Sequence, residues 1–134
     1  MTVAAVIVSS VSLPAFASPL PLQKGIYYGG GSRYIQIAAK GARLCFHGYS
    51  GRGATVASIT PDPGLEGFYR INGWTDTVLY QQDLKTLLFG STNNLLPYEA
   101  DDNLSQDISG SLQQCLESNT PFQRRFDARG RLIH

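Results

Sequence analysis

The chain has 134 residues, with 11 basic and 10 acidic side chains and a formal net charge of +1. A balance this close to zero gives no electrostatic reason to expect a nucleic acid or an anionic membrane as partner. The length fits a single monomeric domain that buries a hydrophobic core without a metal, and we expect no cofactor and no metal site.

The first residues have the pattern of an exported protein. An uncharged apolar run, VAAVIVSSVSLPAFA, ends in an A-x-A cleavage pattern before Ser18. It is shorter than the roughly 20 apolar residues of a membrane-spanning helix. We therefore predict a signal peptide over residues 1–17, a secreted or periplasmic mature protein, and no stable membrane insertion after cleavage. A buried N-terminal strand is the alternative interpretation.

The middle of the chain alternates strand-forming and turn-forming residues. Short runs rich in Tyr, Ile, Val, Phe and Thr are separated by Gly, Pro, Asn and Asp, which is typical of an antiparallel meander or small barrel. We expect a mainly β fold with one C-terminal α-helix packed on the sheet. The domain would cover residues 18–121, and the basic residues 122–134 would form a frayed tail. The seven predicted strands cover residues 25–28, 33–39, 42–49, 54–60, 67–72, 77–82 and 86–90.

The second and third predicted strands form a hairpin. We place its turn at Lys40 and Gly41, because glycine supplies the positive φ that such a turn needs. With a two-residue loop, Tyr34 would lie opposite His47. Side chains alternate along a strand, so Cys45, His47 and Tyr34 would share the face opposite to the aliphatic side chains.

An amphipathic helix is predicted in the segment NLSQDISGSLQQCLESNTP. Its apolar residues recur at the spacing of one helical face. Ser105 or Asp107 would cap its start, and Pro121 would follow its end. Gly110 would lie inside the helix, where close approach of the backbone to the sheet would explain a glycine. The predicted stripe comprises Leu104, Ile108, Leu112, Cys115 and Leu116.

The two cysteines are expected to form a disulfide bond. An exported protein with two cysteines pairs them as a rule, and Cys45 and Cys115 would both lie between the helix and the sheet. The bond would close a loop of about 70 residues, worth about 4 kcal/mol in the chain-entropy model. A free thiol or a metal ligand is the alternative, although a zinc site would lack its other ligands.

The catalytic motifs in the sequence are incomplete. GYSGR approaches the G-x-S-x-G nucleophile elbow around Ser50, but Arg52 occupies the last position and the strand-turn-helix context is missing. A serine triad would depend on His47 alone, because His134 is the terminal residue.

An acidic stretch follows the predicted strands. Polar residues at 101, 103, 105 and 107 fall on the first, third, fifth and seventh positions of an EF-hand-like register, but Gln106 replaces the required glycine and Leu112 the bidentate glutamate. Helix capping is the interpretation that we favour, and a weak calcium site is the alternative.

Aromatic and arginine side chains near the end of the third strand are the candidate binding surface. Strand alternation directs some of the tyrosines outward, where Tyr and Trp favour recognition. The Asn-Gly turn at residues 72–73 would present the only tryptophan, although burial of Trp74 in the core is the alternative. The candidate ligand-binding residues are Tyr34, His47, Tyr49, Arg52 and Trp74.

These patterns favour a non-enzymatic binding or envelope-associated module. Its expected partner is a protein or glycan of the cell envelope. The alternative is an inhibitor of an extracellular hydrolase, acting through the loop ITPDPGLEG at residues 59–67, because its two prolines would stiffen an exposed segment. A small hydrolase is a third, weaker hypothesis.

Overall fold

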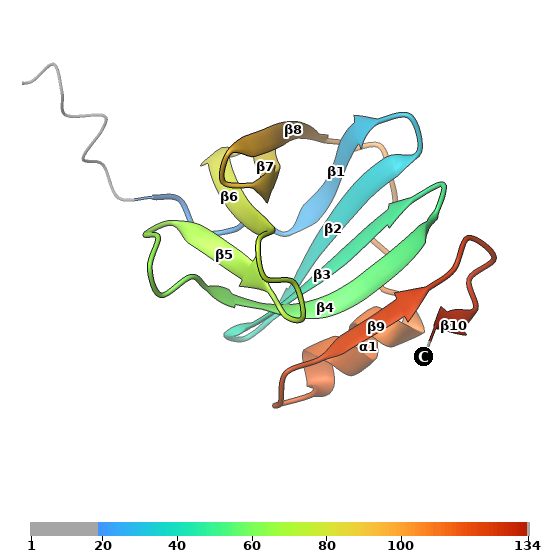
Figure 1. Cartoon of the computed structure of the whole chain (residues 1–134). Helices are drawn as coiled ribbons and strands as arrows, with labels where there is room; N and C mark the ends of the chain where they lie inside the picture. The colour runs from blue at the N-terminus through green and yellow to red at the C-terminus, as the bar shows by residue number, and fades with distance from the viewer. Residues whose placement is uncertain (1–18, 134) are drawn as a thin grey trace, which may run out of the picture.

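The computed structural model of the protein describes residues 19–133, and the predicted signal peptide at residues 1–17 lies outside them. Within the described range the chain forms ten strands and one helix (Figure 1). Their bounds are β1 Gly25–Gly30, β2 Arg33–Lys40, β3 Arg43–Ser50, β4 Gly53–Pro61, β5 Phe68–Ile71, β6 Val78–Asp83, β7 Thr86–Ser91, β8 Asn94–Ala100, α1 Gly110–Glu117, β9 Gln123–Phe126 and β10 Leu132–Ile133.

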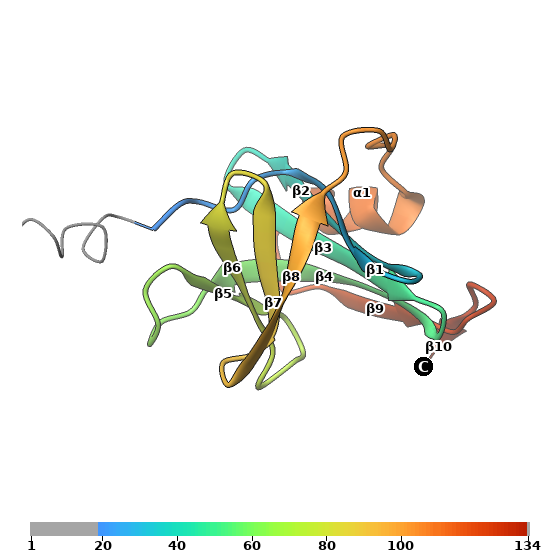
Figure 2. The same ribbon diagram turned by 90° about the horizontal axis from the view of Figure 1, so that it is seen from above.

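Strands β1 to β8 form an antiparallel barrel in which each strand pairs with the next one in the chain. The barrel closes where β8 returns to β1, with Tyr27 opposite Ala100 and Tyr28 opposite Glu99. The strands surround the barrel interior in Figure 1, and Figure 2 shows them from above, with α1 beside β2 and β3. Closure leaves fewer free strand edges than an open sheet. The predicted fold class, a mainly β meander with one C-terminal helix packed on it, is confirmed. The seven predicted strands correspond to β1–β7, and β8–β10 are additional.

The predicted frayed tail is wrong for β9 and β10. Residues 123–126 pair with β4, with Ala54 opposite Phe126, and β10 pairs with β9. The reason is that Phe122 and Phe126 pack against a buried cluster on the outside of the barrel. The C-terminal half of β4 pairs with β5, so the edge of β4 away from β3 pairs with β5 along one half and with β9 along the other. The domain therefore extends past residue 121.

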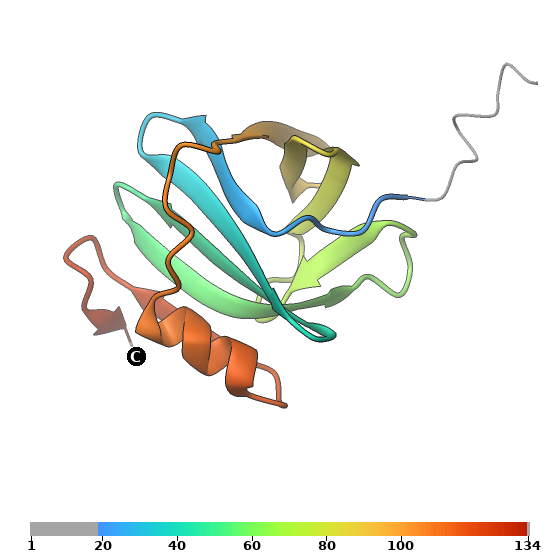
Figure 3. The same ribbon diagram turned by 180° about the vertical axis from the view of Figure 1, so that it is seen from behind.

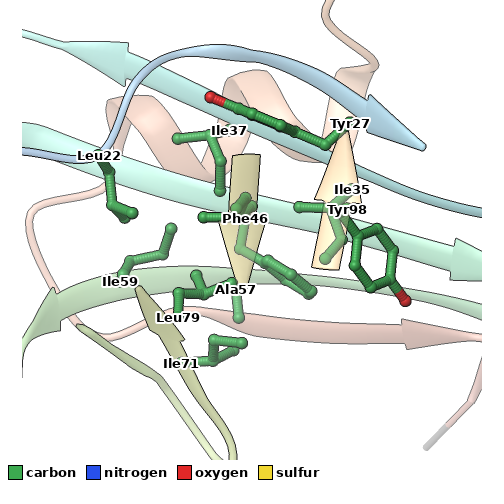
Figure 4. Close-up of a cluster of buried hydrophobic side chains, with 11 residues drawn as sticks. Leu22, Tyr27, Ile35, Ile37, Phe46, Ala57, Ile59, Ile71, Leu79 and Tyr98 are labelled. Atoms are coloured by element: carbon green, nitrogen blue, oxygen red, sulfur yellow. The ribbon is translucent and has the colours of Figure 1, made fainter. Parts of the chain in front are cut away.

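The barrel interior holds the main hydrophobic core. In Figure 4 these side chains converge from the surrounding strands. The end of the barrel near Leu22 is closed by the segment before β1, because the Tyr27 hydroxyl donates to the carbonyl oxygen of Gln23 at 2.7 Å. The carbonyl side-chain oxygen of Gln81 accepts from the Gln23 backbone N–H at 3.0 Å. The core comprises Leu22, Tyr27, Ile35, Ile37, Phe46, Ala57, Ile59, Ile71, Leu79, Leu87 and Tyr98.

A second, smaller core lies between α1 and the outer face of β2, β3 and β4 (Figure 3). Cys45 from β3 forms a disulfide bond with Cys115 from α1. Both cysteines are fully buried. The predicted pairing and the predicted position of the helix on the sheet face that carries Cys45 are confirmed. The cluster comprises Ala38, Cys45, Val56, Leu112, Cys115 and Leu116.

The helix is shorter than predicted. Ser109 is its N-cap and accepts from the Leu112 N–H at 3.2 Å, so the helix begins after both predicted caps. Leu104 and Ile108 are 37% and 44% exposed and belong to the preceding loop. Gly110 is the first helical residue, and a Cβ there would meet no atom within 4 Å. The predicted close approach at Gly110 is therefore wrong.

The register of the β2–β3 hairpin differs from the prediction by two residues. The loop is Gly41–Ala42, and Tyr34 lies opposite Tyr49 instead of His47. Gly41 has a φ of 61° and occupies the first loop position, as glycine does in a type II′ hairpin. A shift of two residues leaves each side chain on its predicted face, because side chains alternate with a period of two.

Candidate functional site

The end of the barrel opposite Leu22 opens into a cavity of about 530 Å³. It is lined by residues where β2 begins, where β3 and β7 end, and in the turn after β5. Aromatic and aliphatic side chains form its inner part, and polar and cationic residues form its rim. The side chains that matter most for its chemistry are Phe46, Trp74, Phe89, Leu96, Arg52 and Arg125.

Phe46 forms the floor of the cavity. Its ring lies over the backbone of Gly48, where an added Cβ would come within 2.8 Å of Cε1 of Phe46. The ring stacks on Phe89 at 5.8 Å between centroids and meets the edge of Trp74 at 5.7 Å. Glycine at position 48 therefore permits this ring position, which separates the packed core from the open cavity.

Trp74 is held by a hydrogen-bonded turn after β5. Its backbone N–H donates to the carbonyl oxygen of Ile71 at 3.1 Å, and Gly73 has the positive φ of 91° that the third position of a type II turn requires. Gln123 of β9 donates from Nε2 to the carbonyl oxygen of Asn72 at 2.9 Å. The half-buried indole thus packs on the core and also lines the cavity.

Three arginines lie at the rim, and no aspartate or glutamate of the described range 19–133 lines this cavity. Arg33 donates from Nε to the Gly30 carbonyl oxygen at 3.3 Å, and its guanidinium lies 5.6 Å from the centre of the Tyr98 ring. Arg52 and Arg125 are exposed. Neither of their side chains forms a hydrogen bond or an ion pair with another residue in the range 19–133.

A row of aromatic rings crosses the outer face of β1, β2 and β3 beside this rim. Tyr28 and Tyr34 are 5.0 Å apart between centroids, Tyr34 and Tyr49 are stacked at 5.6 Å, and Tyr49 lies 5.3 Å from His47. Tyr34 and Tyr49 also line the cavity. These two tyrosines therefore belong both to the aromatic row on the outer face of the sheet and to the rim of the cavity.

His47 does not line this cavity. It lies on the outer side of β3, in an adjoining hollow of about 450 Å³ beside the loop before α1, and the two hollows share Tyr49 and Ser50. Its Nδ1 is buried and has no hydrogen-bond partner among the described residues. Burial lowers the pKa of His47 below its ordinary value of 6.5, because desolvation disfavours the imidazolium form.

Four of the five predicted site residues therefore meet at the cavity: Tyr34, Tyr49, Arg52 and Trp74. The sequence prediction missed Arg33, Arg125, Phe89 and Leu96. Arg33 and Phe89 lie in predicted strands, but only barrel closure brings them to one end. Leu96 and Arg125 lie in strands that were not predicted.

The acidic stretch after β8 forms local contacts. Asp101 accepts from the Asn103 N–H at 3.1 Å, and Asp102 pairs with Lys85 at 2.9 Å. Across residues 19–133 no group of three or more His, Cys, Asp or Glu side chains is placed to hold a metal ion. A turn accounts for the geometry of this stretch.

The proline-containing loop after β4 is exposed and internally braced. The Asp62 Oδ1 atom accepts from the N–H groups of Gly64 and Leu65 at 2.8 and 3.1 Å, and the Asp62 carboxylate pairs with Arg70 at 3.3 Å. Leu65 is 41% exposed. The loop thus presents an apolar side chain to solvent.

No protein-family model, curated protein or solved structure matches this chain. In the described part of the chain no helix has the length and apolar character needed to cross a membrane.

Proposed function

We propose that the protein is a non-enzymatic binding module whose ligand enters the open end of the barrel. The observation that carries this proposal is the cavity of about 530 Å³, which contains Trp74 and is bordered by Tyr34, Tyr49 and Arg52. Ligand pockets in proteins typically measure about 300–1,000 Å³ and combine apolar walls with a few polar groups.

The barrel architecture supports this proposal. An eight-stranded barrel has an interior that is either filled by side chains or able to hold one small ligand. Here Leu22 and the aliphatic core fill one half, while Phe46 forms the boundary of an open half. The closed half would keep the rim strands in place while a ligand enters.

The local chemistry around His47 also favours binding over catalysis. The Oγ atom of Ser50 accepts from the Arg52 backbone N–H at 3.2 Å, which fits a turn residue. His47 lines only the adjoining hollow, whereas Ser50 lines both that hollow and the cavity. No described contact joins Ser50 to His47, so neither residue has the geometry of a nucleophile with its base.

The disulfide bond fits an oxidising compartment. We therefore extend the proposal to a secreted or periplasmic protein whose ligand belongs to the cell envelope or its surroundings. A protein or glycan of the envelope that presents a small group to the cavity would suit the site. N-terminal sequencing of protein from its native host tests the export step, which requires a mature chain that begins at Ser18.

A probe titration tests the proposed cavity. N-phenyl-1-naphthylamine is a neutral, apolar fluorophore that absorbs where tryptophan emits, and Trp74 is the only tryptophan. We expect one molecule to bind and to quench Trp74 emission. Leu96→Glu, which places a charge in the cavity wall, should weaken binding about tenfold or more, because a bound apolar probe would remove water from the carboxylate.

Leu84→Glu is the matched control, because Leu84 is 63% exposed and lies in the β6–β7 turn, outside the cavity. It should leave probe binding unchanged. Failure of the probe to bind, binding without quenching of Trp74, or equal loss in both variants would overturn the cavity as the binding site.

A second candidate is inhibition of an extracellular hydrolase through the loop after β4. The exposed Leu65, held in a turn braced by Asp62, is the observation that favours it, since a preorganised loop loses less entropy on docking. A pulldown from an envelope extract with wild-type protein and Leu65→Ala separates the candidates. An inhibitor should bring down one hydrolase stoichiometrically and lose it in the variant, whereas a cavity binder should not.

A further inference from the structure

We propose that the ligand is a small amphipathic organic anion, with a flat apolar body that enters the cavity and an anionic group that remains at the rim. This inference rests on the proposed binding function and names the class of ligand. It narrows the expected partners to molecules that carry an anionic group, because a neutral glycan would form no ion pair with the cationic rim.

The charged side chains around the opening of the cavity are all cationic within residues 19–133. Arg33, Arg52 and Arg125 line the cavity, and no Asp or Glu side chain among residues 19–133 does. Asp76 and Asp127 line neighbouring hollows instead, and Asp127 is already paired with Arg131 at 3.0 Å. The chain as a whole carries a net charge of only +1. The positive character of the rim is therefore a local feature.

The three guanidinium groups differ in whether they already have hydrogen-bond partners. Arg33 is held against the carbonyl oxygens of Gly29 and Gly30, so its charge has a fixed position. Arg52 and Arg125 have no side-chain partner within residues 19–133 and retain all their donors. An arginine fork matches the paired oxygens of a carboxylate, sulfonate or phosphate, so the rim suits an anionic group.

The inner part of the cavity has apolar, largely aromatic walls. Trp74 and Phe89 are half-buried rings whose centroids lie 6.1 Å apart, and Leu96 is 41% exposed. Aromatic walls favour flat apolar groups through offset or edge-to-face contacts. The arginines and these apolar walls line the same cavity, so one ligand can contact the walls with its apolar body and the arginines with its anionic group.

A pair of probes that differ only in charge tests this inference. The anion 8-anilinonaphthalene-1-sulfonate has the same apolar body as N-phenyl-1-naphthylamine with a sulfonate added. We expect wild-type protein at low salt to bind the anion about tenfold more tightly, a modest value for charge-assisted hydrogen bonds. Raising the salt concentration should reduce this preference, because the rim is exposed.

The double variant Arg52→Ala, Arg125→Ala should lose most of the preference and bind the neutral probe as before. Lys40→Ala is the control for charge, because Lys40 is exposed and lies at the far end of β2. It should keep the preference. Thermal unfolding of each variant verifies the fold, and the salt series on wild-type protein supplies the same test if the double variant unfolds.

The two proposals fail in different ways. If the neutral probe binds and the anion has no advantage, or if the advantage survives in the folded double variant, the anionic ligand class is wrong and the cavity remains the binding site. If neither probe binds, the proposed function fails and the ligand class fails with it.

Discussion

Gln123 donates a hydrogen bond of 2.9 Å to the carbonyl oxygen of Asn72, which joins strand β9 to the turn that carries Trp74. The Nδ2 group of Asn72 donates in turn to the carbonyl oxygen of Phe122 at 3.1 Å. Asn72 is thus held by β9 and by the residue just before it, so this segment helps to position the one tryptophan of the candidate site.

Replacing Gln123 with alanine should loosen this turn. We expect the free energy of unfolding to fall by about 0.5–1.5 kcal/mol, the usual net value of one hydrogen bond, and the fluorescence anisotropy of Trp74 to fall as the indole gains freedom. Gln113→Ala on α1 is the control, because the hydrogen bond that the Gln113 side chain donates within residues 19–133 is to Glu117 of the same helix. Equal anisotropy in both variants would show that β9 does not position Trp74.

Removing the disulfide should destabilise the fold strongly. The bond between Cys45 and Cys115 closes a loop of 70 residues, worth about 4 kcal/mol in the chain-entropy model, against a usual total stability of about 5–15 kcal/mol. Urea unfolding of the oxidised and reduced protein measures this difference, and non-reducing peptide mapping should recover the linked pair. Two free thiols after aerobic purification would contradict the assignment.

Gly48 is predicted to be intolerant of a side chain. The buried ring of Phe46 must move if a Cβ is added at Gly48, and overpacking of a core usually costs about 1–3 kcal/mol. Gly48→Ala should also change the affinity for the probe, because a displaced Phe46 ring alters the floor of the cavity. Gly110→Ala should be neutral or stabilising by up to about 1 kcal/mol, because it adds a better helix former in open space. A stable, fully binding Gly48→Ala protein would refute this account of the cavity floor.

The burial of His47 predicts a pH dependence of stability. Its folded pKa lies below the ordinary 6.5 because of desolvation, so the unfolded chain binds the proton more readily. The contribution of neutral His47 is complete above about pH 6.5 and is lost as the pH falls through the folded pKa. Asp107 and Asp127 line the same hollow, and their attraction for an imidazolium would oppose this shift.

Urea midpoints measured between about pH 7.5 and 5 should therefore decrease for wild-type protein more than for His47→Gln. The lower limit avoids most of the titration of ordinary carboxyl groups. An identical pH dependence in the two proteins would mean that His47 does not titrate abnormally.

Local patterns were sufficient to predict the fold class, the two faces of β2 and β3, and the disulfide. Alternation along the strands placed Cys45 on the outer face, and the helical stripe placed Cys115 opposite to it. The hairpin register was wrong because glycine can occupy either loop position, and only tertiary pairing shows which one it takes. The face assignment survived because the error was an even number of residues.

The missed strands show what local patterns cannot predict. Pro97 in β8 has no N–H and argues against a strand, yet it pairs with Leu88 of β7, and the pairing between β8 and β1 is confined to Glu99 and Ala100. In β9 the charged sequence QRRF indicates a tail, but Phe126 docks on the outer core. Because the cavity depends on both strands, Leu96 and Arg125 could not be predicted as site residues.

The most direct test of the central claim is a map of where a ligand perturbs the folded protein. In ¹H–¹⁵N spectra recorded while 8-anilinonaphthalene-1-sulfonate is added, we predict saturable shifts of the Trp74 indole N–H and of the Gly48 and Leu96 amides. The amide signals of Gln113 and Leu116 on α1 should not shift. Shifts concentrated on α1 and the hollow beside it, with the Trp74 indole signal unmoved, would contradict a ligand site at the open end of the barrel.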